Sequence, residues 1–208
     1  GGMRILEALG FEIRKYHMNE GHSSLLALEL LKGCEGDPKK VRKRCVFTTH
    51  TPVEAGHDKF SYDLVSELIE DGDKIEMLKR FGGGQRLNMT LFALNLSNYV
   101  NGVAKKHRDV SRAMFPGYVI HSVTNGVHSY TWTCPPFREL YDRYLPGWAN
   151  EPELLVRVDV IPDDLMVVAH AKAKKDLIDL VNRSTGTEMD PQVLTLGFAR
   201  RSTEYKRP

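Results

Sequence analysis

Residues 44–52 read Arg-Cys-Val-Phe-Thr-Thr-His-Thr-Pro, a short apolar run that ends in polar residues. The β-branched and aromatic residues of this run predict a β-strand over 44–49. His50 and Thr51 follow at the carboxyl end of that strand. Similar runs alternate along the chain with amphipathic stretches, so the sequence predicts an α/β fold in which helices cover a parallel sheet.

The other elements are predicted outward from this strand. Further strands are expected over 12–18, near Tyr99, over 118–123 and, as a buried strand, over 192–198. Helices are expected over 23–31, over 62–80 as one or two helices, over 88–96 and over 104–114. A long helix is expected after Pro162, capped by Asp163 or Asp164 and running to about Asn182.

A change in composition divides the chain. Between 131 and 155 the sequence is rich in proline and aromatic residues, which is typical of a connector. We therefore expect one domain up to residue 130, a connector over 131–160 and the start of an incomplete second domain over 161–208. The first residue is glycine and not methionine, and we expect the chain to be a piece of a longer protein.

Composition narrows the class of protein. The 208 residues are 41% hydrophobic, enough for a buried core, and no stretch approaches the roughly 18 apolar residues of a membrane span. Twenty-nine basic against 27 acidic residues leave a net charge of +2, which disfavours nucleic acid as a partner. The three cysteines lack a Cys-x-x-Cys pair and indicate neither a disulfide framework nor a zinc knuckle. With no export signal visible, a cytoplasmic location is expected.

Polar side chains gather where predicted strands end. The four groups are Asn19-Glu20-Gly21-His22, His50-Thr51, Thr124-Asn125-Gly126 and Arg200-Arg201. In open α/β sheets ligands bind outside the carboxyl ends of the strands, so the groups predict one shared site. The first three also fit a plainer interpretation, because the first could cap the next helix and the second and third could be ordinary turns.

Three other patterns do not predict a chemical site. His17 and His22 stand five residues apart across a predicted strand-to-helix junction, whereas paired helical metal ligands stand four apart, so zinc is disfavoured. The glycines at 82–84 lack the Gly-Lys-Ser/Thr ending of a phosphate loop and favour a surface loop. The basic run over 39–44 is predicted to be a solvated approach to the next strand.

Four cations follow the last predicted strand within eight residues, at Arg200, Arg201, Lys206 and Arg207. Guanidinium groups bind phosphate oxygens in pairs and an ammonium adds a compact charge, so this segment suits one or two phosphates. A solvated surface turn is the alternative that charge alone leaves open.

Five motifs follow one another along the chain: Tyr16-His17-Met18-Asn19-Glu20-Gly21-His22, Phe47-Thr48-Thr49-His50-Thr51-Pro52, Asn101-Gly102-Val103-Ala104-Lys105-Lys106-His107, Val123-Thr124-Asn125-Gly126-Val127-His128, and Gly197-Phe198-Ala199-Arg200-Arg201 running into Glu204-Tyr205-Lys206-Arg207. In this order they resemble the α-glucan phosphorylases, which comprise the glycogen, starch and maltodextrin phosphorylases. The resemblance covers essentially the whole chain and is strongest to the shorter bacterial and archaeal branch.

This resemblance implies a fold and a reaction. The fold is the two-domain glycosyltransferase-B type, with Rossmann-like halves and the active site between them. Residues 1–130 would be the C-terminal part of the first half, and 161–208 the start of the cofactor-binding half. The reaction is phosphorolysis of an α-1,4-glucan or maltodextrin by inorganic phosphate, which releases glucose 1-phosphate with retained configuration. The family uses pyridoxal phosphate, whose phosphate group takes part in proton transfer.

The resemblance also implies roles for single residues. His50 and Asn125 would hold the glucosyl unit, and Asn19, Glu20 and His22 would line the same pocket. Substrate phosphate would be held by Arg201, with Arg200 and Tyr205 beside it, and the cofactor phosphate by Lys206. Such a cluster agrees with the chemistry, because two phosphates close together need several fixed cations.

Some features depart from the family or lie outside the chain. Asn-Glu-Gly-His at 19–22 replaces Asn-Asp-Thr-His of the muscle-type branch, and Ser202-Thr203 replaces Ile-His. The lysine that attaches the cofactor lies, in the family, beyond residue 208, so we expect this chain alone to be inactive. Effector control and a homo-oligomer of the complete enzyme stay open. So do two other classes: a glycosyltransferase-B synthase that uses a nucleotide sugar, and a glucan-binding module without catalysis.

Overall fold

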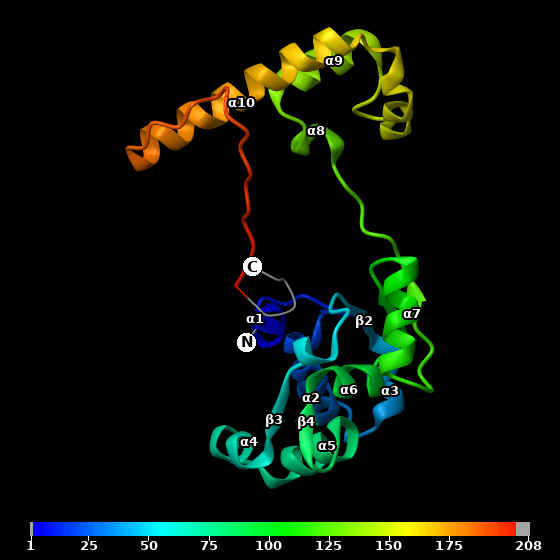
Figure 1. Cartoon of the computed structure of the whole chain (residues 1–208). Helices are drawn as coiled ribbons and strands as arrows, with labels where there is room; N and C mark the ends of the chain where they lie inside the picture. Colours follow the sequence, from blue (N-terminus) through cyan, green and yellow to red (C-terminus); the bar gives the residue numbers. More distant parts are fainter. Residues whose placement is uncertain (1, 203–208) are drawn as a thin grey trace. The chain divides into compact units, whose positions relative to one another are not determined.

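A computed structural model of the chain describes residues 2–202 and divides the chain into two units, Gly1–Asn125 and Gly126–Pro208 (Figure 1). Each unit has its own core, and each is described here by itself. Within the described residues no helix is long and apolar enough to cross a membrane.

The first unit is built on a parallel sheet. Its four strands lie in the order β1 (Tyr16–Asn19), β2 (Cys45–Thr49), β5 (Tyr99–Gly102) and β6 (His121–Ser122). This confirms the predicted α/β class with a parallel sheet. β1 begins four residues later than predicted, after the exposed residues Glu12, Arg14 and Lys15.

The last strand of this sheet is shorter than the predicted strand over 118–123, and only two of its residues pair with β5. Ile120 is fully buried, whereas the side chains of Val119 and Val123 are 70% and 54% exposed. The apolar pattern over 118–123 therefore predicted too long a strand at this edge of the sheet.

Helices and a small second sheet complete the first unit. The helices are α1 (Gly2–Ala8), α2 (Leu25–Gly33), α3 (Pro38–Arg44), α4 (Tyr62–Leu68), α5 (Gly72–Gly82), α6 (Met89–Asn95) and α7 (Lys105–Met114), with 3₁₀ turns η1 (Gly21–Ser23) and η2 (Glu54–Gly56). The second sheet is an antiparallel pair, β3 (Lys59–Ser61) with β4 (Arg86–Asn88), against which α4 and α5 pack.

Four helices of the first unit, α3, α4, α5 and α6, begin where a side chain accepts a hydrogen bond from the first turn. Asp37 accepts from Lys39, Asp71 from Lys74 and Asn88 from Leu91, each at the backbone N–H. Such caps satisfy amide donors that have no partner inside the helix. α3 was not predicted from the sequence, although Asp37 followed by Pro38 is a typical helix start.

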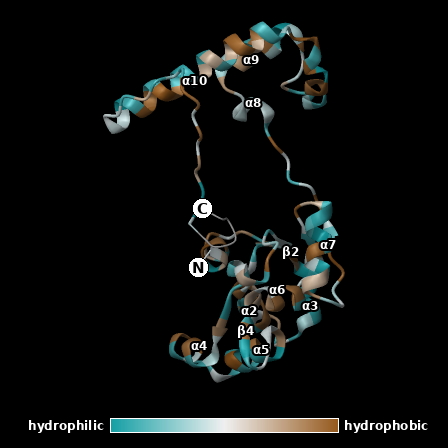
Figure 2. Ribbon diagram, viewed as in Figure 1, coloured by the Kyte–Doolittle hydropathy of each residue, from teal (hydrophilic) through white to brown (hydrophobic). Residues whose placement is uncertain are grey.

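The core of the first unit lies between the sheet and its helices. Met18, Phe47, Leu31 and Phe92 are fully buried there, on β1, β2, α2 and α6. Burial of each such side chain stabilises the fold by about 1.5–3 kcal/mol. In Figure 2 the ribbons of α3 and α7 are coloured mostly hydrophilic.

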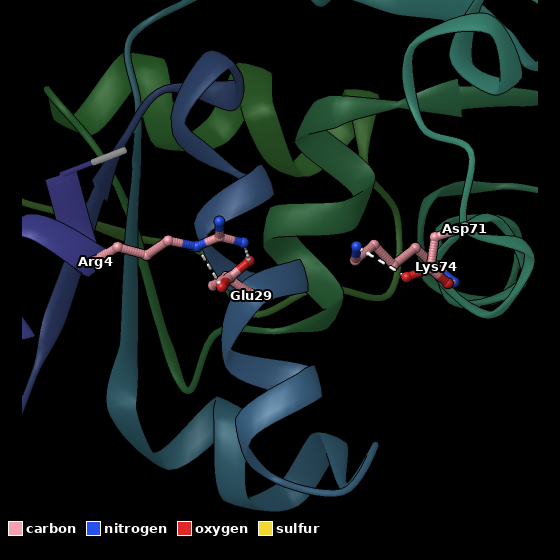
Figure 3. Close-up of polar contacts among 4 residues, drawn as sticks. All are labelled: Arg4, Glu29, Asp71 and Lys74. Atoms are coloured by element: carbon pink, nitrogen blue, oxygen red, sulfur yellow. Dashed lines mark hydrogen bonds and ion pairs between the residues drawn. The ribbon is translucent and has the colours of Figure 1, made fainter.

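Ion pairs join elements on the surface of this unit. Arg4 of α1 binds both carboxylate oxygens of Glu29 on α2, at 2.8 and 2.9 Å (Figure 3). The hydrogen bond from Arg4 lowers the pKa of Glu29. Lys74 pairs with Asp71 at 2.9 Å at the start of α5. Exposed pairs contribute about 0–1 kcal/mol, so the Arg4–Glu29 pair orients α1 on α2 more than it stabilises the unit.

The second unit is helical in its described part. It contains α8 (Ser129–Trp132), α9 (Pro135–Tyr144), the 3₁₀ segment η3 (Pro152–Val160) and α10 (Asp163–Thr185), and α9 packs on α10. Trp148 is fully buried in a small core with Leu145 and Ile161, and its Nε1 donates to Asp142 Oδ1 at 2.8 Å. The proline- and aromatic-rich stretch is therefore largely helical and supplies a core.

Two predictions in this unit are wrong. Residues 192–198 form no strand, and the side chains of Leu194 and Leu196 are 82% and 88% exposed. A strand needs a partner to satisfy its backbone, and the described part of the second unit contains none. The predicted aspartate cap of the long helix is also absent, because Pro162 occupies the N-cap position and no side chain caps α10.

Candidate functional site

Four of the five motifs adjoin one edge of the parallel sheet. Because β1, β2, β5 and β6 are parallel, their carboxyl ends lie at the same edge. Asn19 pairs with Thr48 in the register of β1 and β2, and His50 stands two residues beyond Thr48. Asn125 follows β6, and its backbone N–H donates to the Val103 carbonyl at 3.1 Å.

The side chains of Asn19, His22, His50 and Asn125 are all exposed at or just beyond this edge. The structure thus brings the sugar-binding candidates of the first unit to one edge of one sheet. Their meeting within a single sugar-sized pocket stays a prediction.

The carboxylate of Glu20 joins the ends of β1 and β2. Its Oε1 accepts from the Gly21 backbone N–H at 3.1 Å and from the Thr49 hydroxyl at 3.3 Å. Its Oε2 accepts from the His50 backbone N–H at 2.7 Å and from the Thr51 hydroxyl at 2.9 Å. The capping interpretation therefore holds for Glu20 at η1, while its other three hydrogen bonds reach the neighbouring strand end.

The turn that contains Glu20 packs closely on α6. Gly21 is buried, and a Cβ atom at this position would lie 3.0 Å from Thr90 Oγ1 and 3.3 Å from Met89 Cβ. Only glycine lets the two backbones approach this closely without a shift. The glycine of the Asn-Glu-Gly-His motif is thus explained by packing.

A chain of hydrogen bonds crosses three strands at the same edge. His17 Nε2 lies 2.7 Å from Thr48 Oγ1, and that hydroxyl donates to Asn101 Oδ1 at 2.9 Å. Because Thr48 has a single hydroxyl proton, His17 must carry the proton on Nε2 that Thr48 accepts. Thr48 and Asn101 are each only 7% exposed, so the chain ties β1, β2 and β5 together beneath the exposed edge.

Thr48 and Asn101 were not predicted as site residues. Polar residues inside otherwise apolar strands were the available signal. Buried polar atoms are almost always hydrogen-bonded, which makes such positions candidates for a network.

Two buried histidines support the segments beside the site. His57 Nδ1 lies 2.8 Å from Thr90 Oγ1, and its ring meets Phe115 edge to face with centroids 5.1 Å apart. Burial lowers the pKa of His57, because the charged imidazolium is poorly solvated there. His107 Nδ1 accepts from the Val103 backbone N–H at 3.2 Å. Both rings hold loops that lead to the candidate residues.

The phosphate-binding candidates belong to the second unit. Arg200 and Arg201 are exposed in a segment without regular secondary structure. Tyr205 and Lys206, with Arg207, lie outside the described residues, so their predicted roles stay predictions. Over residues 2–202 no group of three histidine, cysteine or acidic side chains could hold a metal ion.

The first unit is an α/β domain with an open parallel sheet, the class that binds ligands at the carboxyl edge. Comparison with known proteins narrows this class. The chain is 34% identical to the maltodextrin phosphorylase of Thermococcus litoralis over 243 aligned residues, which cover all of this chain and 29% of that protein. It is 31% identical to the glycogen phosphorylase of Aquifex aeolicus, with all of this chain and 36% of that protein covered.

A third relative is the glycogen phosphorylase of Mycobacterium tuberculosis, 35% identical over 92% of this chain and 28% of that protein. No protein-family model matches the chain. The chain is thus related along its length to the maltodextrin and glycogen phosphorylases, and it spans between 28% and 36% of the length of these three relatives.

Proposed function

We propose that the natural protein containing this chain is an α-glucan phosphorylase, and that the first unit supplies its sugar-binding edge. The protein would split an α-1,4-glucan or maltodextrin with inorganic phosphate and release glucose 1-phosphate with retained configuration. The observation that carries the proposal is the meeting of four phosphorylase-like motifs at the carboxyl edge of one parallel sheet. The two-domain glycosyltransferase-B fold is part of this proposal.

The exposed polar groups suit a sugar. Sugar hydroxyls both donate and accept, and the amides of Asn19 and Asn125 can do the same, as can the imidazoles of His22 and His50. These groups stand on segments that are themselves hydrogen-bonded, which limits the reorganisation needed on binding. A pocket of this kind also favours the charge that develops on the glucosyl ring as its bond to the glucan breaks.

The phosphate side of the reaction is assigned to the second unit. Arg201 would bind the substrate phosphate through two parallel N–H···O bonds, and Arg200 and Tyr205 would lie beside it. Pyridoxal phosphate, when bound, supplies a phosphate group that exchanges a proton with the substrate phosphate. The exposed guanidinium groups of Arg200 and Arg201 fit the phosphate chemistry of such a site, and Lys206 would hold the cofactor phosphate.

The test uses the natural protein in its full encoded length, supplied with pyridoxal phosphate. Maltoheptaose and inorganic phosphate should yield glucose 1-phosphate, and a nucleotide sugar offered in place of phosphate should not extend the glucan. Asn125→Ala should lower the rate, whereas Asn98→Ala, at another exposed asparagine of the first unit, should not. Glucan extension from the nucleotide sugar alone would favour the synthase, and binding without turnover would favour the glucan-binding module.

A further inference from the structure

We infer that Glu20 is a positioning residue: its carboxylate fixes the backbone of His50 and Thr51 so that the sugar-binding edge is preformed, and it does not itself contact the sugar. This inference rests on the proposed function for the nature of the ligand. It differs from the role that the resemblance implied, in which Glu20 lines the pocket as a contact.

The acceptor sites of the Glu20 carboxylate are already in use. An ionised carboxylate offers about four lone-pair sites. Gly21 and Thr49 occupy those of Oε1, and His50 and Thr51 occupy those of Oε2. A sugar hydroxyl could bind this carboxylate only by displacing one of these donors. The exposed side chains of His22 and His50 could bind a sugar hydroxyl without displacing a donor of this carboxylate.

The backbone of Glu20 shows how strongly this arrangement is imposed. Its φ is 71° and its ψ is 166°, a combination that is essentially restricted to glycine. A non-glycine residue stays there only when surrounding interactions over-determine it. In addition to the side-chain bonds, the Glu20 backbone N–H donates to the Thr48 carbonyl at 2.9 Å. The strained backbone of Glu20, just after β1, is therefore held in place by hydrogen bonds from both its backbone and its side chain to the end of β2.

The segment that Glu20 holds is anchored at its other end as well. It starts at His50, whose N–H makes the shortest bond to Glu20, and runs to His57, whose ring contacts Thr90 on α6. Thr49, which also donates to Glu20, is 1% exposed, whereas the His50 side chain is exposed. We call the Glu20 carboxylate with its four hydrogen bonds the clamp. The clamp fixes the backbone of His50 while the His50 side chain stays exposed, which lowers the entropy cost of binding a sugar.

Three variants separate positioning from contact. Glu20→Gln keeps the shape but replaces one acceptor oxygen by a donor NH₂ group, so one pair of donors loses its acceptor. Glu20→Gly removes the clamp and also relieves the backbone strain, so it should fold even if the glutamine variant does not. Glu54→Gln is the matched control, because Glu54 lies in the same segment but is exposed and pairs only with Lys59 among the described residues.

Two measurements are made on each variant of the full-length protein. The first is amide hydrogen exchange at His50, which reports on the clamp and does not depend on activity. The second is steady-state kinetics with glucan and phosphate varied separately. In Glu20→Gly the His50 amide should exchange about ten- to a hundredfold faster, as loss of a hydrogen bond to a charged group predicts. In Glu20→Gln the increase should be smaller, because the remaining amide oxygen can still accept from His50 but carries no charge. The KM for glucan should rise and the KM for phosphate should not, while Glu54→Gln should match the wild type in both.

The outcomes distinguish this inference from the proposed function. A wild-type protein that neither splits nor binds glucan would overturn the proposed function, and the clamp would then stand or fall on the His50 amide alone. An active wild type whose His50 exchange or glucan KM is unchanged in both Glu20 variants would overturn the inference. Equal rises in the KM for glucan and for phosphate would also overturn it, because they indicate general destabilisation.

Discussion

His107 Nδ1 accepts a hydrogen bond from the Val103 backbone N–H at 3.2 Å, and the Val103 carbonyl accepts from the Asn125 N–H at 3.1 Å. A buried ring on α7 thus fixes Val103, the residue to which the segment of Asn125 is hydrogen-bonded. His107 is 8% exposed, so it can support the site without reaching a ligand. The same ring explains why a glycine ends β5.

Gly102→Ala should destabilise the first unit. An added Cβ would lie 2.6 Å from His107 Nδ1 and 3.2 Å from the Arg108 backbone nitrogen, and the buried ring has little room to move. Overpacking of this kind lowers the free energy of unfolding by about 1–3 kcal/mol. Urea unfolding followed by circular dichroism measures it. The control is Gly84→Ala, where no atom lies within 4 Å of the added Cβ, and equal effects in both variants would contradict the prediction.

The folded protein should lose stability as the pH is lowered, because buried His57 must then take up a proton. Burial lowers the pKa of this histidine in the folded protein, so the unfolded chain binds the proton more readily. Its contribution is therefore fully present above the unfolded pKa of about 6.5 and is lost as pH falls from there through the lower folded value. The free energy of unfolding of wild type and His57→Gln, measured between those limits, should differ in slope. An identical slope in the two proteins would contradict the prediction.

The three cysteines should react with iodoacetamide in order of exposure. Burial raises the pKa of the Cys45 thiol to about 11, so at pH 8 only about one thiol in a thousand is ionised. Cys134 is exposed and Cys34 half-buried. Peptide mass spectrometry should find Cys134 labelled first, Cys34 next and Cys45 only in urea. Early labelling of Cys45 in the native protein would show that the first-unit core is open at this position.

Arg201→Ala in the full-length protein should weaken the use of phosphate and leave glucan binding unchanged. A charge-assisted contact contributes about 1.5–3 kcal/mol, which corresponds to a rise of roughly ten- to a hundredfold in the KM for phosphate. Arg201→Lys should not restore the affinity, because one ammonium cannot replace the planar guanidinium. Arg183→Ala, at another exposed arginine of the second unit, is the control. An unchanged KM for phosphate in Arg201→Ala would favour the solvated-turn interpretation of this segment.

Local pattern was enough for much of the first unit. The strand predicted over 44–49 is observed at Cys45–Thr49, and the helix predicted over 104–114 at Lys105–Met114. Both succeed because alternation, periodicity and capping act between residues a few positions apart. The same kind of pattern wrongly predicted a strand over 192–198, because the second unit offers this apolar run no partner strand within the described residues. Hydrophobicity alone does not say what a strand will pair with.

By itself, the sequence predicted that Asn19, His50 and Asn125 stand at or just after the carboxyl ends of strands, and hence that they could share a sheet edge. Only the tertiary structure decided three of the four partners of the Glu20 carboxylate, which lie 29 to 31 residues away on β2 and just beyond it. The partners of Thr48 are similarly remote, at His17 and Asn101. Hydrogen bonds of this kind depend on strand order and register, which arise when the whole core packs and leave no trace in local spacing.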